Sequence, residues 1–201
     1  MKFSRSRKYD FPTEFSIGKS STLQVKSELK ILGVIVQSSL KWDSQCTEMV
    51  RRATNCTWVI RRMKSLGVRQ SLLVEYWKSE GRVMLEYACP VWHSSLTVAQ
   101  SRSLDRAQRV AMAAITGRWV RSHTAQLREL GLERLELRRQ RICERFGERT
   151  ATNSRHQDMF RINPNNRTRG GQNRRYIEIN TRTAMYHKSA LPYLTRQLNN
   201  H

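Results

Sequence analysis

The sequence predicts a mainly α-helical fold, with a β-hairpin region at the N-terminus and a basic, poorly ordered arm near the C-terminus. Apolar and polar residues alternate within residues 14–36, and from residue 42 apolar residues recur every three or four positions. Residues 153–173 are rich in Asn, Arg and Gly and nearly devoid of apolar residues, as in linkers and disordered segments. We therefore divide the chain into a β region (1–41), a helical bundle (42–150), and a basic linker with a C-terminal tail (151–201).

Three short segments of the β region have strand patterns. Residues 14–18 and 22–25 alternate apolar with polar side chains, and residues 18–21 have the composition of a connecting turn. Residues 30–36 form a β-branched apolar run, which favours a strand buried on both faces. Gly33 inside this run indicates a bulge or a close backbone approach.

The first helix pattern begins after Trp42, where Asp43 or Ser44 can act as the N-cap, and ends at Gly67. Arg51, Asn55 and Arg62 fall on its polar face. Its apolar stripe comprises Cys46, Met49, Val50, Ala53, Cys56, Ile60 and Met63.

A second helix is predicted from about Ser71 to Tyr87, interrupted on its apolar side by Glu80. Pro90 stops it, because proline lacks an N–H and restricts the preceding Cys89 to extended geometry. The expected stripe comprises Leu72, Leu73, Tyr76, Trp77, Val83, Met84 and Tyr87.

Thr97 and Gln100 form a capping box for a third helix, which has small apolar residues on one face and ends at Gly117. A short helix over 123–130 and a further helix marked by Leu132, Leu135, Ile142 and Phe146 follow. Residues 176–179 could add a short strand, and residues 186–198 could dock as a terminal hook.

The charge balance favours a polyanionic partner. Lys and Arg number 37 against 16 Asp and Glu, a formal net charge of +21. Nucleic acid is the first candidate; ribosomes, acidic proteins or a merely solvated basic surface remain open. The candidate contacts recur along the helices and the arm: Arg51, Arg62, Arg102, Arg106, Arg109, Arg138, Arg139, Arg145, Arg174 and Arg175. Of five tryptophans able to stack on bases, Trp119, between Arg118 and Arg121, is the best candidate.

Four scattered cysteines at no metal-ligand spacing favour a reducing compartment. No run approaches the roughly 20 apolar residues of a membrane span, and the N-terminal residues lack a signal-peptide pattern. We therefore expect a soluble nuclear or cytoplasmic protein with no membrane partner.

The sequence offers little for catalysis. Its aspartates, Asp10, Asp43, Asp105 and Asp158, occur singly, whereas two-metal polymerase chemistry needs clustered carboxylates. Cys89 with His93 could form a thiol–imidazole pair or half of a zinc site, although packing at a helix junction is favoured. Glu80 and Glu86 are expected to pair with arginines from neighbouring helices. No metal or cofactor is predicted.

Three segments carry a family resemblance, in matching order and spacing: residues 29–36 with Leu40-Lys41-Trp42, residues 76–93 followed by Gln108-Arg109, and residues 188–199. The central one contains Leu85-Glu86-Tyr87-Ala88-Cys89-Pro90-Val91-Trp92-His93. These segments resemble the primer grip, the thumb and the C-terminus of LINE-type (non-LTR) retrotransposon reverse transcriptases. The resemblance extends over nearly the whole chain.

In that family the fingers and the catalytic palm, with its Asp-Asp hairpin, precede the primer grip, and this chain begins just before it. The resemblance implies that Leu32, Gly33 and Val34 support a primer end and that the first helix follows the duplex backbone. The expected function is contact with template–primer or element RNA, without polymerisation. The expected partners are RNA, an RNA–DNA duplex or the missing palm and fingers; the parent polymerase would use Mg²⁺. The alternative is a non-catalytic protein-interaction module or a pseudogene product with no selected function.

Overall fold

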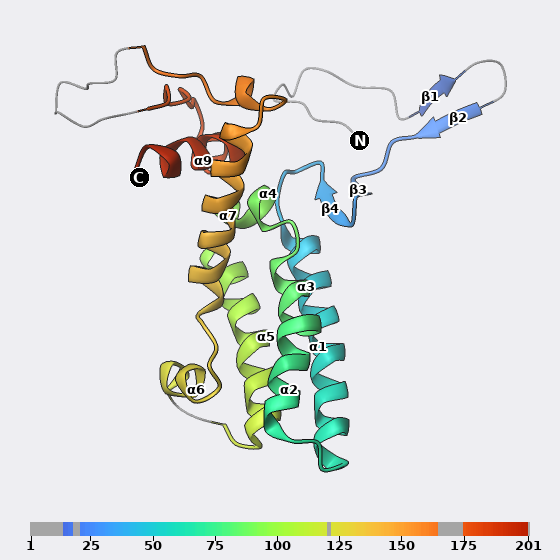
Figure 1. Ribbon diagram of the computed structural model, residues 1–201. Helices are drawn as coiled ribbons and strands as arrows, with labels where there is room; N and C mark the ends of the chain where they lie inside the picture. The colour runs from blue at the N-terminus through green and yellow to red at the C-terminus, as the bar shows by residue number, and fades with distance from the viewer. Residues whose placement is uncertain (1–13, 18–20, 120–121, 165–174, 201) are drawn as a thin grey trace. The chain divides into compact units, whose positions relative to one another are not determined.

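The computed structural model describes residues 14–17, 21–119, 122–164 and 175–200. The fold is mainly helical with small antiparallel hairpins near the N-terminus, as the sequence predicts. The chain divides into two compact units, residues 1–48 and 49–201, each of which is described by itself. Figure 1 shows the elements of each unit.

The first unit contains two hairpins. Strands β1 (Glu14–Ile17) and β2 (Ser21–Gln24) pair antiparallel, as do β3 (Glu28–Ile31) and β4 (Val34–Gln37). Leu32 and Gly33 form the second turn with φ of 46° and 85°, and two-residue hairpin turns with positive φ at both positions match strand twist.

The prediction of one strand over residues 30–36, buried on both faces, is therefore wrong. The apolar run folds back on itself at Leu32, so most of it stays exposed and only Val34 is buried. Gly33 supplies the second positive φ of the turn rather than a bulge.

Helix α1 (Asp43–Ser65) begins in the first unit, and most of its length belongs to the second. Its first turn is tied to the second hairpin: the Gln45 Oε1 accepts a bond from the Ile35 N–H at 2.8 Å, and the Ser44 hydroxyl donates to Glu28 at 2.5 Å. The predicted inward stripe holds: Cys46, Met49, Ala53 and Ile60 are buried.

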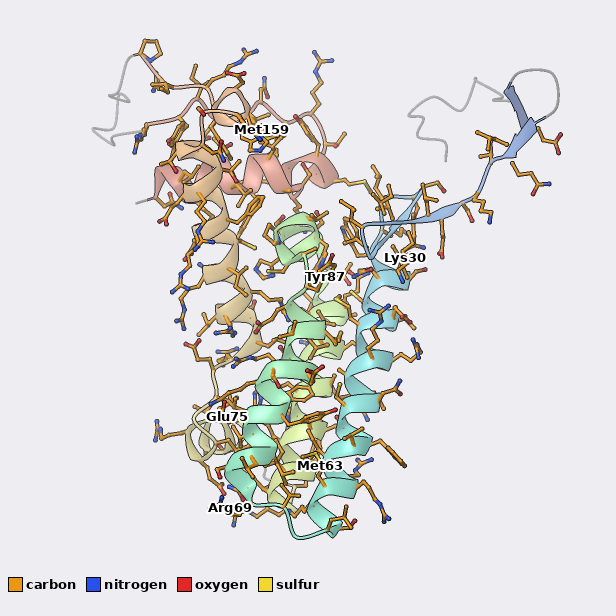
Figure 2. The ribbon with its side chains drawn as sticks, turned by 45° about the vertical axis from the view of Figure 1, so that its right-hand side comes forward. Lys30, Met63, Arg69, Glu75, Tyr87 and Met159 are labelled. Carbon is orange, nitrogen blue, oxygen red and sulfur yellow. The ribbon has the colours of Figure 1, made fainter. Side chains whose placement is uncertain are left out.

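The second unit is built on helices that run side by side, α1, α2 (Gln70–Tyr76), α3 (Arg82–Glu86) and α5 (Val98–Thr116). Side chains fill the space between them and project outward from the other side of each helix (Figure 2). The core includes two fully buried tryptophans, Trp77 and Trp92. At one end, the Lys64 Nζ donates to the Ile115 carbonyl at 2.7 Å and so ties α1 to α5.

Between α2 and α3 the chain makes one π-helical turn, Trp77–Gly81, in which the Arg82 N–H bonds to the Trp77 carbonyl. This turn shifts the register of the residues after it, and the predicted stripe is wrong there at Val83 and Tyr87; it is also wrong at Leu72, which precedes the turn. Leu72, Val83 and Tyr87 are about half exposed, and the inward positions are Leu73, Val74, Trp77, Gly81, Leu85 and Glu86.

Helix α3 ends at an elbow, but not in the predicted way. Ala88 takes a left-handed conformation, with φ of 52°, and a short helix, α4 (Cys89–Trp92), begins directly after it. Pro90 is in the first turn of α4, where its missing N–H costs nothing, so Cys89 is helical rather than extended. The Trp92 indole N–H donates to the Tyr87 carbonyl across the elbow at 3.0 Å.

A 3₁₀ turn, His93–Ser95, leads to α5, whose predicted capping box is confirmed. The Gln100 N–H bonds to the Thr97 hydroxyl at 3.2 Å and the Gln100 amide oxygen accepts from the Thr97 N–H at 2.8 Å. Gly117 closes α5 with φ of 78°. Helices α6 (His123–Glu129) and α7 (Leu135–Thr152) follow near their predicted positions.

The end of the chain packs on α7. After a 3₁₀ turn, Gln157–Met159, come α8 (Ala184–His187) and α9 (Ala190–Asn199), and α9 lies against α7 and α4. In place of the strand expected over 176–179 there is one isolated bridge, between Ile162 and Tyr176. The Asn199 side-chain amide accepts a hydrogen bond from the Tyr176 N–H and donates one to the Tyr176 carbonyl, both at 2.9 Å. Within the described ranges, no helix has the length and apolarity needed to cross a membrane.

Candidate nucleic-acid interface

The outer face of α1 carries a row of exposed polar and aromatic side chains. Arg51, Asn55, Trp58 and Arg62 are spaced by four, three and four residues, which places them on one face of the helix. Trp58 is 67% exposed, unusual for tryptophan, because its position faces away from the core that Ala53 and Ile60 enter. Cations flanking an exposed indole suit a surface that contacts phosphates and bases.

A second basic row follows α5. Arg102, Arg106 and Arg109 are spaced by four and three residues, with the first two exposed and the third half-buried. The guanidinium groups of Arg62, Arg102, Arg106 and Arg145 have no hydrogen-bond or ion-pair partner among the residues that the structure describes. Their charges are therefore not neutralised within the described part of the chain.

The other predicted cations have different surroundings. Arg145 is exposed on α7, and the Arg175 guanidinium lies 5.5 Å from the centre of the Tyr176 ring. Arg174 lies outside the described residues. Arg138 is held by Glu86, with the Arg138 Nε 2.6 Å from a carboxylate oxygen.

Glu86 confirms the predicted pairing of a helix carboxylate with an arginine of a neighbouring helix. Its carboxylate is only 8% exposed and lies between Arg138 of α7 and Arg82 of its own helix, at 2.6 and 3.6 Å. Burial, with Arg138 nearby, lowers the pKa of the Arg82 guanidinium. The cluster joins α3 to α7 and is structural.

Arg139 is a correction to the predicted surface. Its side chain is fully buried, since it shares the inward face of α7 with Leu135, Cys143 and Gly147 at four-residue intervals. Its Nε donates to the His93 Nδ1 at 3.4 Å and its Nη2 to the Ser101 hydroxyl at 3.3 Å. Arg139 cannot reach a phosphate at the surface without leaving this site.

Cys89 and His93 are packing residues at a helix junction, the interpretation that the sequence favours. Burial, with Arg139 close by, lowers the pKa of His93 to about 4, and the ring meets Tyr193 edge-on at 6.0 Å. A hydrogen bond with Cys89 and burial raise the pKa of the Cys143 thiol, which stays protonated at neutral pH. Among the described residues, no group of three or more His, Cys, Asp or Glu could hold a metal ion.

Leu32, Gly33 and Val34, the primer-grip-like residues, belong to the tip of the β3–β4 hairpin. Leu32 is 88% exposed at the turn, and Val34 is buried at the start of β4. The described residues of this unit contain no cation cluster comparable with those on α1 and α5.

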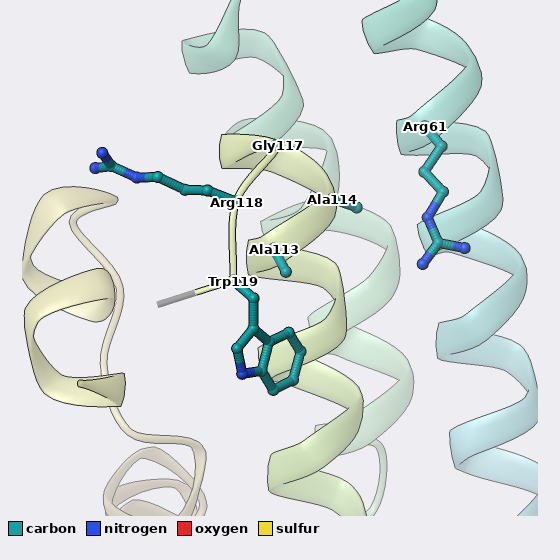
Figure 3. Close-up of a pocket in the computed structure, with 6 residues that line it drawn as sticks. All are labelled: Arg61, Ala113, Ala114, Gly117, Arg118 and Trp119. Carbon is teal, nitrogen blue, oxygen red and sulfur yellow. The ribbon is translucent and has the colours of Figure 1, made fainter. Parts of the chain in front are cut away.

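A pocket that no sequence pattern indicated lies between α1 and the end of α5. It has a volume of about 350 Å³ and is lined by Arg61 of α1 and by residues 113, 114 and 117–119 at the end of α5 (Figure 3). Arg61 is the pocket-lining residue that sequence reasoning missed, whereas Trp58 is one of the five tryptophans already considered for base stacking. The polar face of α1 predicted for Arg51 and Arg62 includes Trp58 by helical spacing, which was the available signal.

Comparison with protein-family models, with curated proteins and with solved structures finds no match for this chain.

Proposed function

We propose that this chain contacts nucleic acid through the basic faces of α1 and α5, as the C-terminal part of a LINE-type reverse transcriptase. The observation that carries the proposal is the pair of basic rows, Arg51 to Arg62 on α1 and Arg102 to Arg109 on α5. Arg109 is half-buried, and Trp58 is exposed between the arginines of the α1 row. The sequence resemblance supplies the kind of nucleic acid, a template–primer duplex or element RNA.

The electrostatics support a backbone-tracking role. A net charge of +21 attracts any polyanion. The exposed guanidinium groups of Arg62, Arg102 and Arg106 have no acidic partner among the described residues. They can replace condensed counterions on phosphates, which makes affinity fall steeply with salt. Neither row presents a set of side chains ordered for reading base edges, so we expect little sequence preference.

We propose further that the chain does not catalyse polymerisation by itself. The sequence contains no adjacent pair of acidic residues, and two-metal transfer needs carboxylates held together. Primer extension with Mg²⁺ or Mn²⁺ tests this directly. Any template-dependent incorporation by the purified chain would contradict it.

The binding test uses fluorescence anisotropy with a labelled RNA–DNA duplex over a series of salt concentrations. We expect a linear fall of log affinity with log salt, and a slope reduced by about 1 for each phosphate contact removed. The variants are Arg62→Ala and Arg106→Ala. Arg182→Ala is the matched control, because Arg182 is exposed, carries the same charge and lies outside α1 and α5.

Two results would count against nucleic-acid contact at these faces. No binding in low salt, or affinity that does not vary with salt, would favour a protein-interaction module or a product with no selected function. Equal losses for Arg182→Ala and Arg62→Ala would mean that overall charge, rather than the two rows, attracts the nucleic acid.

A further inference from the structure

We infer that the pocket at the end of α5 binds one unpaired nucleotide of a single strand, with the base on Trp119 and its phosphate at Arg61. The inference rests on the proposed nucleic-acid contact and adds the class of ligand, an unpaired base. The pocket volume of about 350 Å³ is at the lower end of the range of roughly 300–1,000 Å³ for small-molecule sites. That size suits one flat ring with its sugar and phosphate.

Trp119 presents a stacking surface. Its side chain is 59% exposed, and the Arg109 guanidinium lies 5.1 Å from the ring centre. A guanidinium at this distance contacts one face of an indole by a cation–π interaction and restricts its rotation. A base can then stack on the exposed remainder without first ordering the side chain.

Hydrogen bonds from Thr116 and Gln126 hold the turn that carries Trp119. Gly117 adopts φ of 78°, the Thr116 hydroxyl donates to the Arg118 carbonyl at 3.0 Å, and the buried Gln126 amide donates to Thr116 at 3.2 Å. Arg118 itself points away toward α6, where Glu129 holds it at 2.9 and 3.0 Å (Figure 3). The Trp119 backbone therefore follows a braced turn, and Arg118 is already paired.

The charge at the pocket favours an anion despite its position at a helix C-terminus. Unpaired carbonyls there carry partial negative charge that repels phosphate. Lys64 offsets this charge, because its Nζ donates to the Ile115 carbonyl at 2.7 Å. Arg61 lies on the side of α1 toward α5 (Figure 3) and has no hydrogen-bond or ion-pair partner among the described residues.

The floor of the pocket explains why an unpaired base suits it better than a duplex. Ala113 and Ala114 leave room beside the indole that a longer side chain would fill. Bases in a duplex present their edges to the groove and keep their faces stacked on one another, so a face is available only in a single strand. Arg102 and Arg106 extend along α5 from this point and can follow the strand's phosphates.

The experiment compares a labelled single-stranded oligothymidylate with the RNA–DNA duplex, using the full chain. We expect Trp119→Ala to weaken single-strand binding by about 5- to 150-fold, the range for loss of one stacked base. The dependence of single-strand affinity on salt should stay the same, because no charge is removed. Trp119→Phe should retain most of the affinity.

Arg61→Ala should weaken single-strand binding and lower its salt slope by about 1. Arg128→Ala, exposed on α6 and of equal charge, is the control and should change neither quantity comparably. Circular dichroism and thermal unfolding verify that each variant is folded; Trp119, Arg61 and Arg128 are all exposed, so no loss of stability is expected.

The two proposals fail separately. Unchanged single-strand affinity in Trp119→Ala, with duplex binding intact, overturns the pocket and leaves the proposed function standing. Absence of duplex binding by the unmodified chain overturns the proposed function, while a Trp119-dependent loss for the oligothymidylate still supports the pocket. A third result would assign the pocket to proteins and overturn the inference. In it, an acidic peptide displaces the oligonucleotide from the unmodified chain but not from Trp119→Ala, while Trp119→Ala leaves the affinity for the oligonucleotide itself unchanged.

Discussion

Residue-level chemistry at the junction of α4, α5 and α7 predicts a specific dependence of stability on pH. His93 is held neutral because burial and Arg139 lower its pKa to about 4, whereas the unfolded chain has a histidine pKa near 6.5. Between these values the unfolded chain binds more protons than the folded one, so stability falls as the pH drops from 6.5 toward 4.

We expect this group to contribute a loss on the order of 2–3 kcal/mol in the free energy of unfolding over that window. Urea unfolding at pH 7 and pH 4.5 measures the total change, to which carboxylates also contribute. His93→Asn keeps an acceptor for Arg139 but cannot titrate, so its pH dependence should be shallower. Equal pH dependence of the two proteins would contradict the buried neutral imidazole.

Replacing two of the helical glycines by alanine should change the free energy of unfolding in opposite directions. A Cβ on Gly81 would overlap the ring of Trp77, which is fully buried and cannot move aside, so Gly81→Ala should destabilise by about 1–3 kcal/mol. Gly147 lies inside α7, and a Cβ added there would meet its nearest side-chain atom, on Leu194, at an ordinary contact distance of 3.5 Å. Gly147→Ala should stabilise by about 0.5–1 kcal/mol, because alanine loses less backbone entropy in a helix. Chemical denaturation of both variants compares them; two shifts of the same sign would be inconsistent with the packing described.

At the scale of elements, helix α5 depends on its first turn. Thr97 and Gln100 satisfy each other's backbone N–H groups, so Thr97→Ala should lower the free energy of unfolding by about 0.5–2 kcal/mol. Thr54→Ala is the control, because that exposed hydroxyl bonds only to the carbonyl one turn back in α1. Thermal unfolding should show a larger loss of stability for Thr97→Ala than for Thr54→Ala. Equal losses would contradict a stabilising role of the capping box beyond that of an ordinary helix hydroxyl.

Much of the helical architecture was predictable because its signals are local. The capping box at Thr97 and the exit glycine Gly117 each fix one helix boundary through the chemistry of a few adjacent residues. The π-turn was not predictable in this way. A change from i+4 to i+5 bonding leaves no residue pattern of its own, and the full burial of Trp77 at this turn depends on tertiary packing.

The candidate interface was predictable in part for the same reason. Helical spacing places Arg51 and Arg62 together. No spacing distinguishes Arg139, whose neighbours Trp92, His93 and Ser101 come from distant parts of the sequence. The prediction that arginines on α7 face solvent therefore fails at Arg139. The pocket was not predictable because Arg61 and Trp119 are brought together only by packing.

For the whole molecule, the charge of +21 predicts opposite responses to salt for stability and for binding. Like charges repel one another in the folded protein, so added salt should raise its melting temperature in the absence of nucleic acid. The same salt should weaken nucleic-acid binding. Thermal unfolding and anisotropy over one salt series measure both; a melting temperature that falls with salt would show that attractive ion pairs, such as the Glu86 cluster, dominate instead.

The π-turn at Trp77–Gly81 has a consequence for how this chain tolerates changes of length. Buried Leu73, Trp77, Gly81 and Leu85 recur every four residues, and on a regular α-helix each such step rotates about 40° past a full turn. One wider turn takes up part of that excess and keeps the four positions facing the same neighbours. Deleting a single residue there would restore regular hydrogen bonding but rotate α3 relative to α2 and move Glu86 away from Arg138. The wide turn thus acts as a phase correction between two helical segments, and the spacing on either side of it is constrained as strictly as the residue types.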